Sequence, residues 1–555
     1  MSAPSAYETP GFRAPIDLDL SRNEGRPGAL SLDRLTAGLE ETVSRYPDVT
    51  PLREALAHRL AVSPDQVLIT AGADDALLRC FMSIEGGTAV AAKPTFEMIR
   101  RYSEQTGVGL IEVDWPEGPF PLEGFLDAAD DGATTAFVVS PNNPTGAVIT
   151  ARDLTALAGR FGTVVYDAAY VEFADADLTR IAQMFPNVIS LRTLSKAYGL
   201  AGLRIGYAVG DREQIERLAA YGNPYPVSSV SALIATETLA SGTSDDFVAR
   251  VRDEREDLRW LLTALGVDSL PSQANFVLAR PRDPGWLVGA AAALGVGLRS
   301  FRGQPGLEPF VRIGLPGDPL HFDRLVRTLL TVLSPEAIIF DLDGVVAADA
   351  YTRTVLATAG TFGVRVGTED VWEARGEGNA NDDWELTRRL CARAGVDLPY
   401  ETVREVFEEI YQGTPGAPGL KATETPTVPT GLLEKVASRF PIAIVTGRPR
   451  DDAMEFLDRF GLTDLFGAIV TREDAPMKPD PAPVRLALQR LGVTRAWMLG
   501  DTVDDLAAAR AAGVLPIGVI APNADPDRAR SDLSAAAVVL DTTARIIEVL
   551  DAQNV

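Results

Sequence analysis

The chain has 555 residues, of which 46% are hydrophobic and 23% charged, and its 52 basic and 77 acidic residues leave a formal net charge of −25 at pH 7. This is the composition of a globular protein with several domains. The negative charge excludes sequence-independent binding to nucleic acid or to an anionic membrane surface, because both require positive fields. With only 2 cysteines (Cys80 and Cys391) and 2 histidines, a disulfide framework, a zinc finger and a histidine-rich metal site are excluded as well.

No membrane span or secretory signal is expected. The two longest charge-free runs, 132–151 and 218–236, are interrupted by PNNPTG and NPYP, which would leave unsatisfied backbone groups in lipid. Residues 1–19 contain no basic segment followed by an apolar stretch. We therefore expect a cytoplasmic protein in a reducing compartment.

The N-terminal part of the chain alternates short β-rich runs with helix-compatible stretches. One such helix is 211–221, in which Asp211 can serve as the N-cap. This alternation predicts a parallel sheet covered by helices, with ligands at the carboxyl ends of the strands. The predicted strands are 66–70, 88–92, 135–139, 163–167, 188–192 and 205–209.

A second series of strands predicts a separate α/β domain in the C-terminal part. Between its first two strands lies a stretch with helical patterning, at about 348–438, which we interpret as a helical insertion. A helical run ends at Ser334-Pro335 just before the new strand series, so we expect one domain in 1–333 and another in 334–555. The predicted strands are 337–341, 441–446, 496–501, 515–520 and 537–541.

The motif TLSKAYGLAGLRIGY (193–207) lies between two predicted strands, downstream of SPNNPTG (140–146) and TVVYD (163–167). With these motifs the chain resembles the class I and II pyridoxal-phosphate aminotransferases, and it is most similar to the histidinol-phosphate aminotransferases. The resemblance runs from about residue 16 to about residue 332 in uninterrupted order. It implies an α/β fold, the fold type I of pyridoxal-phosphate-dependent transferases, with a large domain and a small domain built from the two ends of this span.

The resemblance also implies which residues hold the cofactor, pyridoxal 5'-phosphate. Lys196 matches the lysine that holds the cofactor aldehyde as an imine and then moves the proton between the substrate Cα and the cofactor. Ser195 and Arg204 match ligands of the cofactor phosphate. Asp167 matches the carboxylate that pairs with the pyridinium nitrogen, and Tyr170 matches a donor to the ring oxygen.

Other matches extend this candidate site. A strand, a small-residue turn and a helix start at 69–77 place backbone amides on a helix N-terminus, where they can bind a phosphate. In the family, one further tyrosine reaches the phosphate from the neighbouring subunit, which implies a homodimer. The additional cofactor-binding candidates are the amides of Gly72, Ala73 and Asp74, the ring-stacking Phe96, Asn143 at the ring oxygen, and Tyr46 as the neighbour's tyrosine.

The candidates for substrate binding are Asn23, Asn275, Arg299 and Arg312. In the family, the counterpart of Arg312 binds the substrate carboxylate and that of Arg299 helps to hold a substrate phosphate. Two departures from the family pattern concern the substrate rather than proton transfer. The usual Asp-Glu-Ala-Tyr is here Asp167-Ala168-Ala169-Tyr170, and the N-terminal element reads Asn23-Glu24-Gly25.

In the C-terminal part, IIFDLDGVV (338–346) places Asp341 and Asp343 at a strand end, where both carboxylates can address one cation and one phosphorus atom. The motif resembles the first motif of haloacid dehalogenase-like (HAD) hydrolases of subfamily IA. In that family the first aspartate attacks phosphorus and forms an aspartyl-phosphate, and the second protonates the leaving group and then activates water. Because the dehalogenases lack the second aspartate, Asp343 favours phosphate esters.

The other hydrolase motifs follow in the family's order. Thr446 in IVTGRP supplies a hydroxyl for the phosphoryl oxygens, and Lys478 in MKPDP supplies a cation. In LGDTVDD, Asp501 is a Mg²⁺ ligand and Asp505 a supporting acid. The resemblance implies a Rossmann-like domain whose helical insertion is the cap that selects the substrate. The expected metal site comprises Asp341, Asp343, Asp501 and Asp505.

Together these observations predict a bifunctional enzyme, a pyridoxal-phosphate aminotransferase joined to a Mg²⁺-dependent phosphatase. The expected ligands are an amino-acid or amino-alcohol phosphate and glutamate or 2-oxoglutarate as amino donor or acceptor. Consecutive steps of histidine biosynthesis, the amination of imidazole-acetol phosphate and the dephosphorylation of histidinol phosphate, are the best-motivated pair. Two alternatives stay open: an aminotransferase of other amino-acid or specialised metabolism with a phosphatase for an unrelated ester, and a non-catalytic hydrolase module.

Overall fold

The computed structural model describes residues 11–26, 39–241, 245–348 and 350–554, and the chain divides into two compact units. The first unit contains Asp19–Pro284 and Leu298–Arg324, and the second contains Gly11–Leu18, Gly285–Gly297 and Leu325–Val555. Residues 1–10, on which the expectation of no secretory signal partly rests, lie outside the described residues. The two units are described separately below.

The first unit is built on a seven-stranded sheet of order β2-β8-β7-β6-β5-β3-β4. All six predicted strands are present, and a seventh, β4, was not predicted. Neighbouring strands are parallel except that β8 runs antiparallel to β2 and β7, which differs from the predicted all-parallel sheet. The reason is that only a 3-10 turn, and no crossover helix, joins β7 to β8. The strands are β2 (Val67–Thr70), β3 (Thr88–Lys93), β4 (Gly109–Asp114), β5 (Ala133–Val139), β6 (Thr163–Asp167), β7 (Val188–Thr193) and β8 (Gly206–Val209).

Helices cover both faces of this sheet, because successive strand residues point to opposite faces and both sets are apolar. One face packs on α6 and α7 through side chains such as Phe125 and Leu154. The other packs on α4, α5 and α9 through side chains such as Leu77, Phe81 and Leu218. The helices are α4 (Gly72–Met82), α5 (Met98–Thr106), α6 (Leu122–Asp130), α7 (Ala151–Arg160), α8 (Thr179–Ala182) and α9 (Arg212–Ala219). The Asp211 side chain accepts a hydrogen bond from the Glu213 N–H, as predicted for the N-cap of α9.

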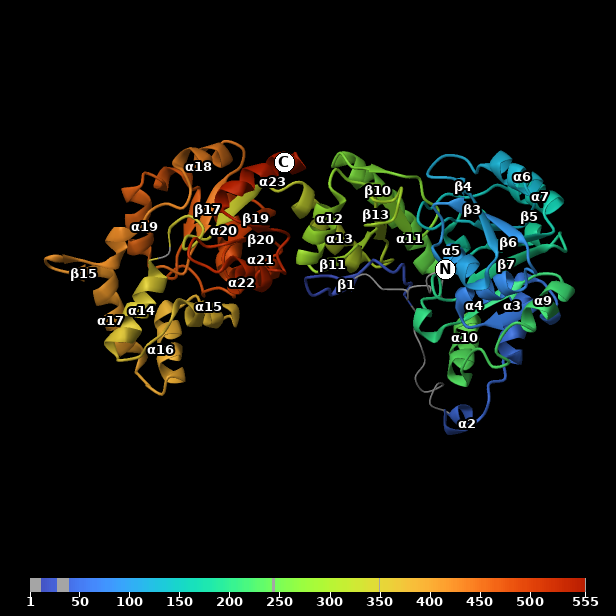
Figure 1. Cartoon of the computed structure of the whole chain (residues 1–555), viewed down its shortest axis with the longest axis horizontal. Coiled ribbons are helices and arrows are strands. Elements are labelled where there is room, and N and C mark those ends of the chain that lie inside the picture. Colours follow the sequence, from blue (N-terminus) through green and yellow to red (C-terminus); the bar gives the residue numbers. More distant parts are fainter. Residues whose placement is uncertain (1–10, 27–38, 242–244, 349, 555) are drawn as a thin grey trace. The chain divides into compact units, whose positions relative to one another are not determined.

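The first unit also contains a four-stranded antiparallel sheet of order β12-β13-β10-β9 and several further helices (Figure 1). In this sheet Arg299 of β12 lies opposite Arg312 of β13. The strands are β9 (Asp268–Ser269), β10 (Phe276–Arg280), β12 (Arg299–Ser300) and β13 (Val311–Gly314). The further helices are α2 (Leu39–Ser44), α3 (Thr50–Leu60), α10 (Ser229–Ser241) and α11 (Asp245–Ala264).

The second unit contains a six-stranded sheet of order β18-β17-β14-β19-β20-β21, in which all neighbouring strands are parallel. The five predicted strands are present, and only the edge strand β18 was not predicted. The strands are β14 (Ala337–Phe340), β17 (Ile442–Val445), β18 (Ala468–Val470), β19 (Ala496–Gly500), β20 (Leu515–Val519) and β21 (Val539–Leu540). The helices that accompany them are α18 (Thr430–Ala437), α19 (Arg450–Arg459), α20 (Ala482–Leu491), α21 (Val503–Ala511), α22 (Pro526–Asp532) and α23 (Ile546–Gln553).

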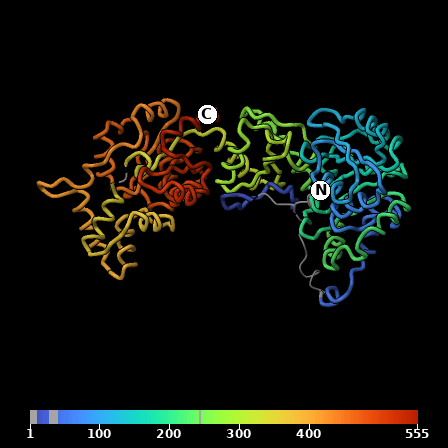
Figure 2. The backbone as a smooth tube through the Cα atoms, viewed as in Figure 1, coloured from blue at the N-terminus to red at the C-terminus, as the bar shows by residue number. Residues whose placement is uncertain are grey.

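The predicted insertion between β14 and β17 is helical. It packs around its own apolar core, which includes Tyr351, Val371, Leu386 and Phe407, and Figure 2 shows it as a lobe beside the sheet of its own unit. The Asp382 side chain caps α16 by accepting from two backbone N–H groups. The elements are α14 (Tyr351–Thr361), α15 (Thr368–Gly376), α16 (Asp383–Arg393), α17 (Tyr400–Gln412) and the hairpin of β15 (Gly413–Thr414) and β16 (Ala417–Pro418).

Segments upstream of the predicted boundary belong to the second compact unit. The buried Trp497 of β19 packs on Trp286 with ring centroids 5.0 Å apart. Its indole N–H donates to the Thr331 carbonyl at 2.8 Å. Trp286 lies in α12 (Pro284–Ala293), and Thr331 lies in α13 (Pro319–Leu333), the helix before Ser334. The remaining short strands are β1 (Leu18–Asp19) and β11 (Val296–Gly297). The boundary at 333/334 therefore separates two strand series, whereas the compact unit extends further upstream.

Among the helices of the described ranges, none combines the length and the apolar character needed to cross a bilayer. Cys80 and Cys391 are both buried free thiols, and burial raises the pKa of Cys80 to about 12. Both cysteines therefore contribute apolar packing.

Candidate active sites

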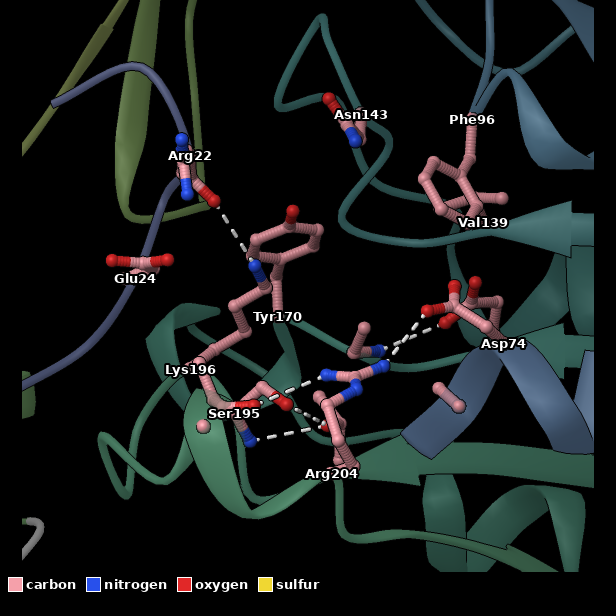
Figure 3. A pocket seen from close by; sticks show the side chains of 16 residues that line it. Arg22, Glu24, Asp74, Phe96, Val139, Asn143, Tyr170, Ser195, Lys196 and Arg204 are labelled. Carbon is pink, nitrogen blue, oxygen red and sulfur yellow. Dashed lines mark hydrogen bonds and ion pairs between the residues drawn. The ribbon is translucent and has the colours of Figure 1, made fainter. Parts of the chain in front are cut away.

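The first unit has a cavity of about 300 Å³ at the carboxyl ends of β6 and β7 and the N-terminus of α4. Figure 3 shows side chains from widely separated segments converging on it. Many of the residues singled out from the sequence line this cavity: Ala73, Asp74, Phe96, Asn143, Asp167, Tyr170, Ser195, Lys196 and Arg204.

Lys196 follows β7 and extends into the cavity. Its Nζ donates to the Arg22 carbonyl at 3.3 Å and lies 5.7 Å from the centre of the Tyr170 ring. Tyr170 is buried, and its hydroxyl accepts a hydrogen bond of 3.3 Å from the Asn23 side-chain amide. The amine and the phenol therefore face the same space (Figure 3).

Asp167 ends β6 and is 6% exposed. Its Oδ1 accepts a hydrogen bond of 3.1 Å from the Ala169 N–H. Burial raises the pKa of Asp167 to about 7, against the lowering effects of that hydrogen bond and of Lys196. A buried carboxylate that faces a cavity is costly unless a cation partners it, so this position suits a positively charged ring nitrogen.

At one end of the cavity, α4 and the segment after β7 form a site for an anion. Ser195 is buried, and its Oγ accepts a hydrogen bond of 2.9 Å from the Thr193 hydroxyl. Arg204 has a positive φ of 53°, and its Nη2 donates to the Asp74 carboxylate at 3.0 Å. Gly72 has a φ of +81°, and a Cβ there would lie 2.5 Å from the Arg204 guanidinium. Only glycine therefore lets the helix N-terminus approach the arginine this closely.

Asn143 lines the cavity, and further amides and a second arginine lie behind it. Arg312 is buried, and it donates to Asn143 Oδ1 and to the Ser21 carbonyl, both at 2.6 Å. Asn275 is fully buried and donates to the Asn23 carbonyl at 3.1 Å. Arg312 thus fixes the orientation of the Asn143 amide, a contact that the sequence did not predict.

The structure gives a steric reason for the glycine in Asn23-Glu24-Gly25, the element that departs from the family pattern. Its N–H donates to the Ser195 carbonyl at 3.4 Å. A Cβ on Gly25 would lie 1.6 Å from the Lys196 carbonyl oxygen. The N-terminal segment therefore crosses directly over the lysine backbone and leaves no space for a side chain.

Several candidates are not part of the lining of this first cavity, namely Asn23, Tyr46, Gly72, Asn275, Arg299 and Arg312. Arg299 lines an adjoining cavity of about 460 Å³, together with Arg312, Phe96 and Lys196. Tyr46 is 79% exposed and stacks on Tyr225 with ring centroids 4.5 Å apart, so within one chain it does not join the other candidates. Its predicted role in a neighbouring subunit's site stays a prediction.

The side chains of the first cavity fit pyridoxal 5'-phosphate. They offer an amine in Lys196, a buried carboxylate in Asp167 and, at the other end, a hydroxyl, a guanidinium and the N-terminus of α4. These groups complement the aldehyde, the ring nitrogen and the phosphate of that cofactor.

The second unit has a polar cluster at the carboxyl ends of β14, β17 and β19. Asp341 follows β14 and is buried. The Lys478 Nζ lies 2.8 Å from Asp341 Oδ1 and 2.5 Å from Asp505 Oδ1. Burial raises the pKa of Asp341 to about 7, although Lys478 lowers it. Thr446 follows β17, and its hydroxyl oxygen accepts from the Arg448 N–H at 3.1 Å.

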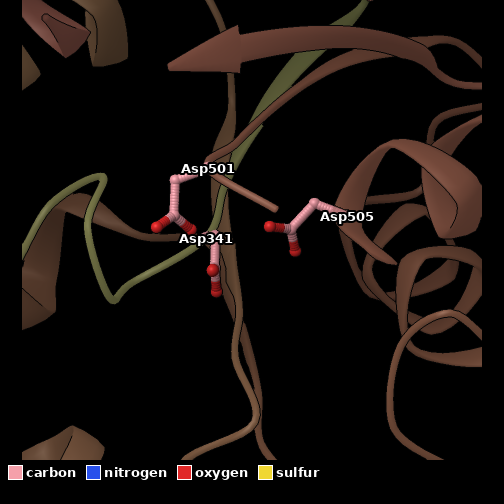
Figure 4. Close-up of side chains that lie close together, drawn as sticks. All are labelled: Asp341, Asp501 and Asp505. Atoms are coloured by element: carbon pink, nitrogen blue, oxygen red, sulfur yellow. The ribbon is translucent and has the colours of Figure 1, made fainter. Parts of the chain in front are cut away.

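Carboxylate oxygens of Asp341, Asp501 and Asp505 all lie within 4.8 Å of one another (Figure 4). Gly344 has a φ of +71°, and a Cβ there would lie 2.3 Å from Asp501 Oδ2, so the glycine lets the first motif pass close to Asp501. Three converging carboxylates are hard oxygen ligands of the kind that Mg²⁺ prefers. The donor set therefore fits this ion.

Asp343, the fourth expected metal ligand, is not part of this group of three. Its carboxylate instead accepts hydrogen bonds from Arg448, a residue that the sequence analysis did not select. Arg448 stands two residues after Thr446 in the quoted motif IVTGRP, so its place at a strand end was the available signal. A further polar cavity beside these residues is lined by cap residues including Arg375, Asn381 and Trp384.

Comparisons with known proteins assign a family to each of two parts of the chain. Residues 21–328 match the family described as aminotransferase class I and II, and residues 335–513 match the haloacid dehalogenase-like hydrolases. A histidinol-phosphate aminotransferase of Caldanaerobacter subterraneus subsp. tengcongensis is 34% identical over 300 residues, which cover 53% of this chain and 85% of that protein.

A second relative is matched over less than half of its length. It is a protein of Phytophthora nicotianae named imidazoleglycerol-phosphate dehydratase, which is 43% identical over 197 residues, covering 34% of this chain and 44% of that protein. Among solved structures, the histidinol-phosphate aminotransferase of Sinorhizobium meliloti in complex with pyridoxal 5'-phosphate is similar with a TM-score of 0.53 and 25% identity, covering 57% of this chain and 91% of that one. The fold comparison therefore extends over the aminotransferase match.

Proposed function

We propose that this chain, which belongs to the class I and II aminotransferase family, transfers an amino group at the first site. The chain also carries a haloacid dehalogenase-like hydrolase domain, and we propose that its site hydrolyses a phosphate ester. The convergence of Lys196, Asp167 and Arg204 on one cavity carries the first half of the proposal. The similarity to histidinol-phosphate aminotransferases supports histidinol phosphate and 2-oxoglutarate as the substrate pair.

At the first site the chain's own residues bind, orient and move a proton. Pyridoxal phosphate, when bound, supplies an electron sink for the substrate Cα. Asp167 keeps the ring nitrogen charged, and Ser195, Arg204 and the amides of Gly72 and Ala73 hold the phosphate. Lys196, whose amine lies in the cavity, would take the proton from the substrate Cα and hold it for return.

Substrate binding falls to the arginine side of the cavities. Arg312 is held rigidly by the Ser21 carbonyl and by Asn143, so its guanidinium is pre-organised for a carboxylate. Arg299 lies opposite it across the β12–β13 pair and lines the adjoining cavity. This second guanidinium suits the phosphate of an amino-alcohol phosphate, and the two arginines together suit a substrate with anionic groups.

At the second site we propose hydrolysis in two steps. Asp341 attacks phosphorus, the bond to the leaving oxygen breaks, and that oxygen takes a proton from Asp343. Water then attacks the phosphorus of the aspartyl-phosphate, Asp343 takes the water proton, and phosphate leaves. Mg²⁺ would be held by Asp341 and Asp501 with support from Asp505, and it would neutralise charge on the phosphoryl oxygens. Lys478 is placed for the same task, because it contacts Asp341 directly.

The experiment incubates the purified chain with pyridoxal phosphate, Mg²⁺, histidinol phosphate and 2-oxoglutarate, and measures glutamate and free phosphate separately. Both products support consecutive steps of histidine biosynthesis. Glutamate without phosphate assigns a different ester to the hydrolase, and the absence of glutamate contradicts the proposed substrate pair.

Matched variants assign each product to its site. We expect Lys196→Ala to abolish glutamate formation and to leave phosphate release intact. Asp341→Asn should abolish phosphate release and leave glutamate formation intact. Adding a chelator to the wild-type chain should stop phosphate release alone. Phosphate release by Asp341→Asn at the wild-type rate would contradict the assignment of the nucleophile.

We also propose that the active protein is a homodimer in which Tyr46 serves the neighbouring site. The exposure of Tyr46 and its stacking on Tyr225 support this proposal. Mixing two inactive variants, Tyr46→Ala and Lys196→Ala, should then restore part of the glutamate formation, because a mixed dimer contains one site with neither defect. No recovery from a mixture that light scattering shows to be dimeric would contradict it.

A further inference from the structure

Arg448 lies at the centre of a buried polar cluster beside the second site. Its side chain is 1% exposed. Its Nε donates to Asp343 Oδ1 and Oδ2 at 3.1 and 2.9 Å, and its Nη2 donates to Oδ1 at 2.5 Å. A planar guanidinium that contacts both oxygens of one carboxylate fixes the orientation of that carboxylate as well as its position.

The other side of Arg448 contacts the part of the chain that returns from the cap. Its Nη2 donates to Glu424 Oε1 at 2.9 Å and its Nη1 to Glu424 Oε2 at 3.2 Å. The Tyr411 hydroxyl, at the end of α17, accepts from Nη1 at 3.2 Å and donates to Glu424 at 3.0 Å. The guanidinium also lies 4.9 Å from the centre of the Tyr351 ring on α14. Three cap-side segments therefore determine where Arg448 sits.

This cluster differs from an ordinary surface ion pair. Glu424 is 4% exposed, so one buried guanidinium is shared between two carboxylates. A well-packed apolar residue can replace a buried ion pair with little loss of stability. The contact between Arg448 and Asp343 is therefore not explained by the stability of the fold. It is explained if the carboxylate that transfers the proton must be held in one orientation.

We propose that Arg448 is a positioning residue, which holds the Asp343 carboxylate in the orientation needed for proton transfer and ties that orientation to the cap through Glu424. The inference rests on the phosphatase activity proposed above, in which Asp343 gives a proton to the leaving oxygen and later takes one from water. The hydrogen bonds of the Arg448 side chain join it to Asp343, Tyr411 and Glu424.

The test compares two aryl phosphates of similar size, 4-nitrophenyl phosphate and phenyl phosphate, with Mg²⁺ present. The 4-nitrophenolate anion leaves without a proton, whereas phenolate needs one. The readout is kcat/KM for 4-nitrophenyl phosphate divided by kcat/KM for phenyl phosphate. This parameter reports the step in which the leaving group departs. A general acid contributes about 10²- to 10⁴-fold, so Asp343→Asn should raise this ratio by about 100-fold or more.

We expect Arg448→Met to raise the ratio by about 10-fold or more, and Arg448→Lys to raise it less, because lysine keeps the charge but cannot hold two oxygens in one plane. In the Asp343→Asn background, Arg448→Met should change the ratio no further, since both act on the same proton transfer. Glu424→Gln should raise the ratio by a few-fold. An unchanged ratio in that variant would remove the cap from the proposal.

The matched control is Arg495, which binds Glu336 and the Ser334 carbonyl at the amino ends of β14 and β19, away from the reacting groups. Arg495→Met should lower both rates equally, if at all. Should Arg448→Met fail to fold, Arg448→Met combined with Glu424→Gln avoids an unpaired buried charge. If Arg448→Met lowers kcat/KM equally for both esters, Arg448 has only a structural role. That result overturns this inference and leaves the proposed hydrolase function standing. A wild-type chain that hydrolyses neither ester, or an active Asp341→Asn, overturns the proposed hydrolase function instead.

Discussion

Replacing the buried Asp167 by asparagine should stabilise the cofactor-free protein at alkaline pH while it removes transamination. Asp167 is 6% exposed, and burial raises its pKa from 3.8 to about 7. The folded protein therefore holds this proton more tightly than the unfolded chain does, so stability falls as the pH rises from about 4 to about 7. At about 1.4 kcal/mol for each pH unit, the ionised carboxylate costs about 4 kcal/mol above this range.

Asparagine has nearly the same shape and no charge to bury. We therefore expect the cofactor-free Asp167→Asn variant to be more stable than the wild type by up to about 4 kcal/mol at pH 8, and equally stable near pH 4. Saturation with pyridoxal phosphate should reverse the order at pH 8, because the carboxylate then has a cationic partner. Active-site residues often reduce the stability of the fold, so replacing them can stabilise a protein while it removes activity.

The assay is amide hydrogen exchange of peptides from β6 and β7, because the two compact units need not unfold together and a single melting curve would mix them. The difference between variant and wild type also cancels contributions from other buried acids, such as Asp341 and Glu254. The reasoning is refuted if the stability difference between Asp167→Asn and the wild type is the same at pH 5 and pH 8. It is also refuted if the cofactor-free wild type is the more stable form at pH 8.

Three further substitutions test close contacts. Gly25→Ala should lower glutamate formation by at least about 10-fold in an activity assay, because its Cβ would overlap the Lys196 carbonyl and displace the lysine. Gly344→Ala should raise the Mg²⁺ concentration for half-maximal phosphate release by about 10- to 100-fold, since its Cβ would displace Asp501. Trp286→Ala should destabilise the second unit by about 3–5 kcal/mol, as measured by amide hydrogen exchange of peptides from β19, because it leaves a cavity beside a buried indole.

The sequence predicted best the residues that follow parallel strands. Asp167, Asp341, Thr446 and Asp501 each come directly after a short apolar run, and parallel strands end at one edge of their sheet. The family resemblances selected these side chains, and their positions at strand ends explain why each set lies at one edge of its sheet. The Lys196 motif follows β7 in the same way and needed no long-range contact to be placed.

Contacts between distant segments could not be predicted in this way. Arg448 and Glu424 were not selected from the sequence, although both are charged and buried. Nothing in local periodicity indicates that two such residues will pair, because burial of a charge depends on which segments the fold brings together. The reversed direction of β8 was missed for a related reason, since the sequence showed a strand but not the absence of a crossover helix before it.

In both sites the proposed reactive group follows a strand, and a segment remote in the sequence contacts it. Lys196 donates to the Arg22 carbonyl, 174 residues away in the sequence. Asp343 is held by Arg448, 105 residues away, which in turn contacts Glu424 at the return from the cap. A strand end fixes where a Cα lies, but long side chains such as lysine and arginine keep several rotatable bonds. The second contact is what converts that position into a defined direction. Because Arg448 and Glu424 make this contact through their side chains, substitutions there should alter turnover more than fold.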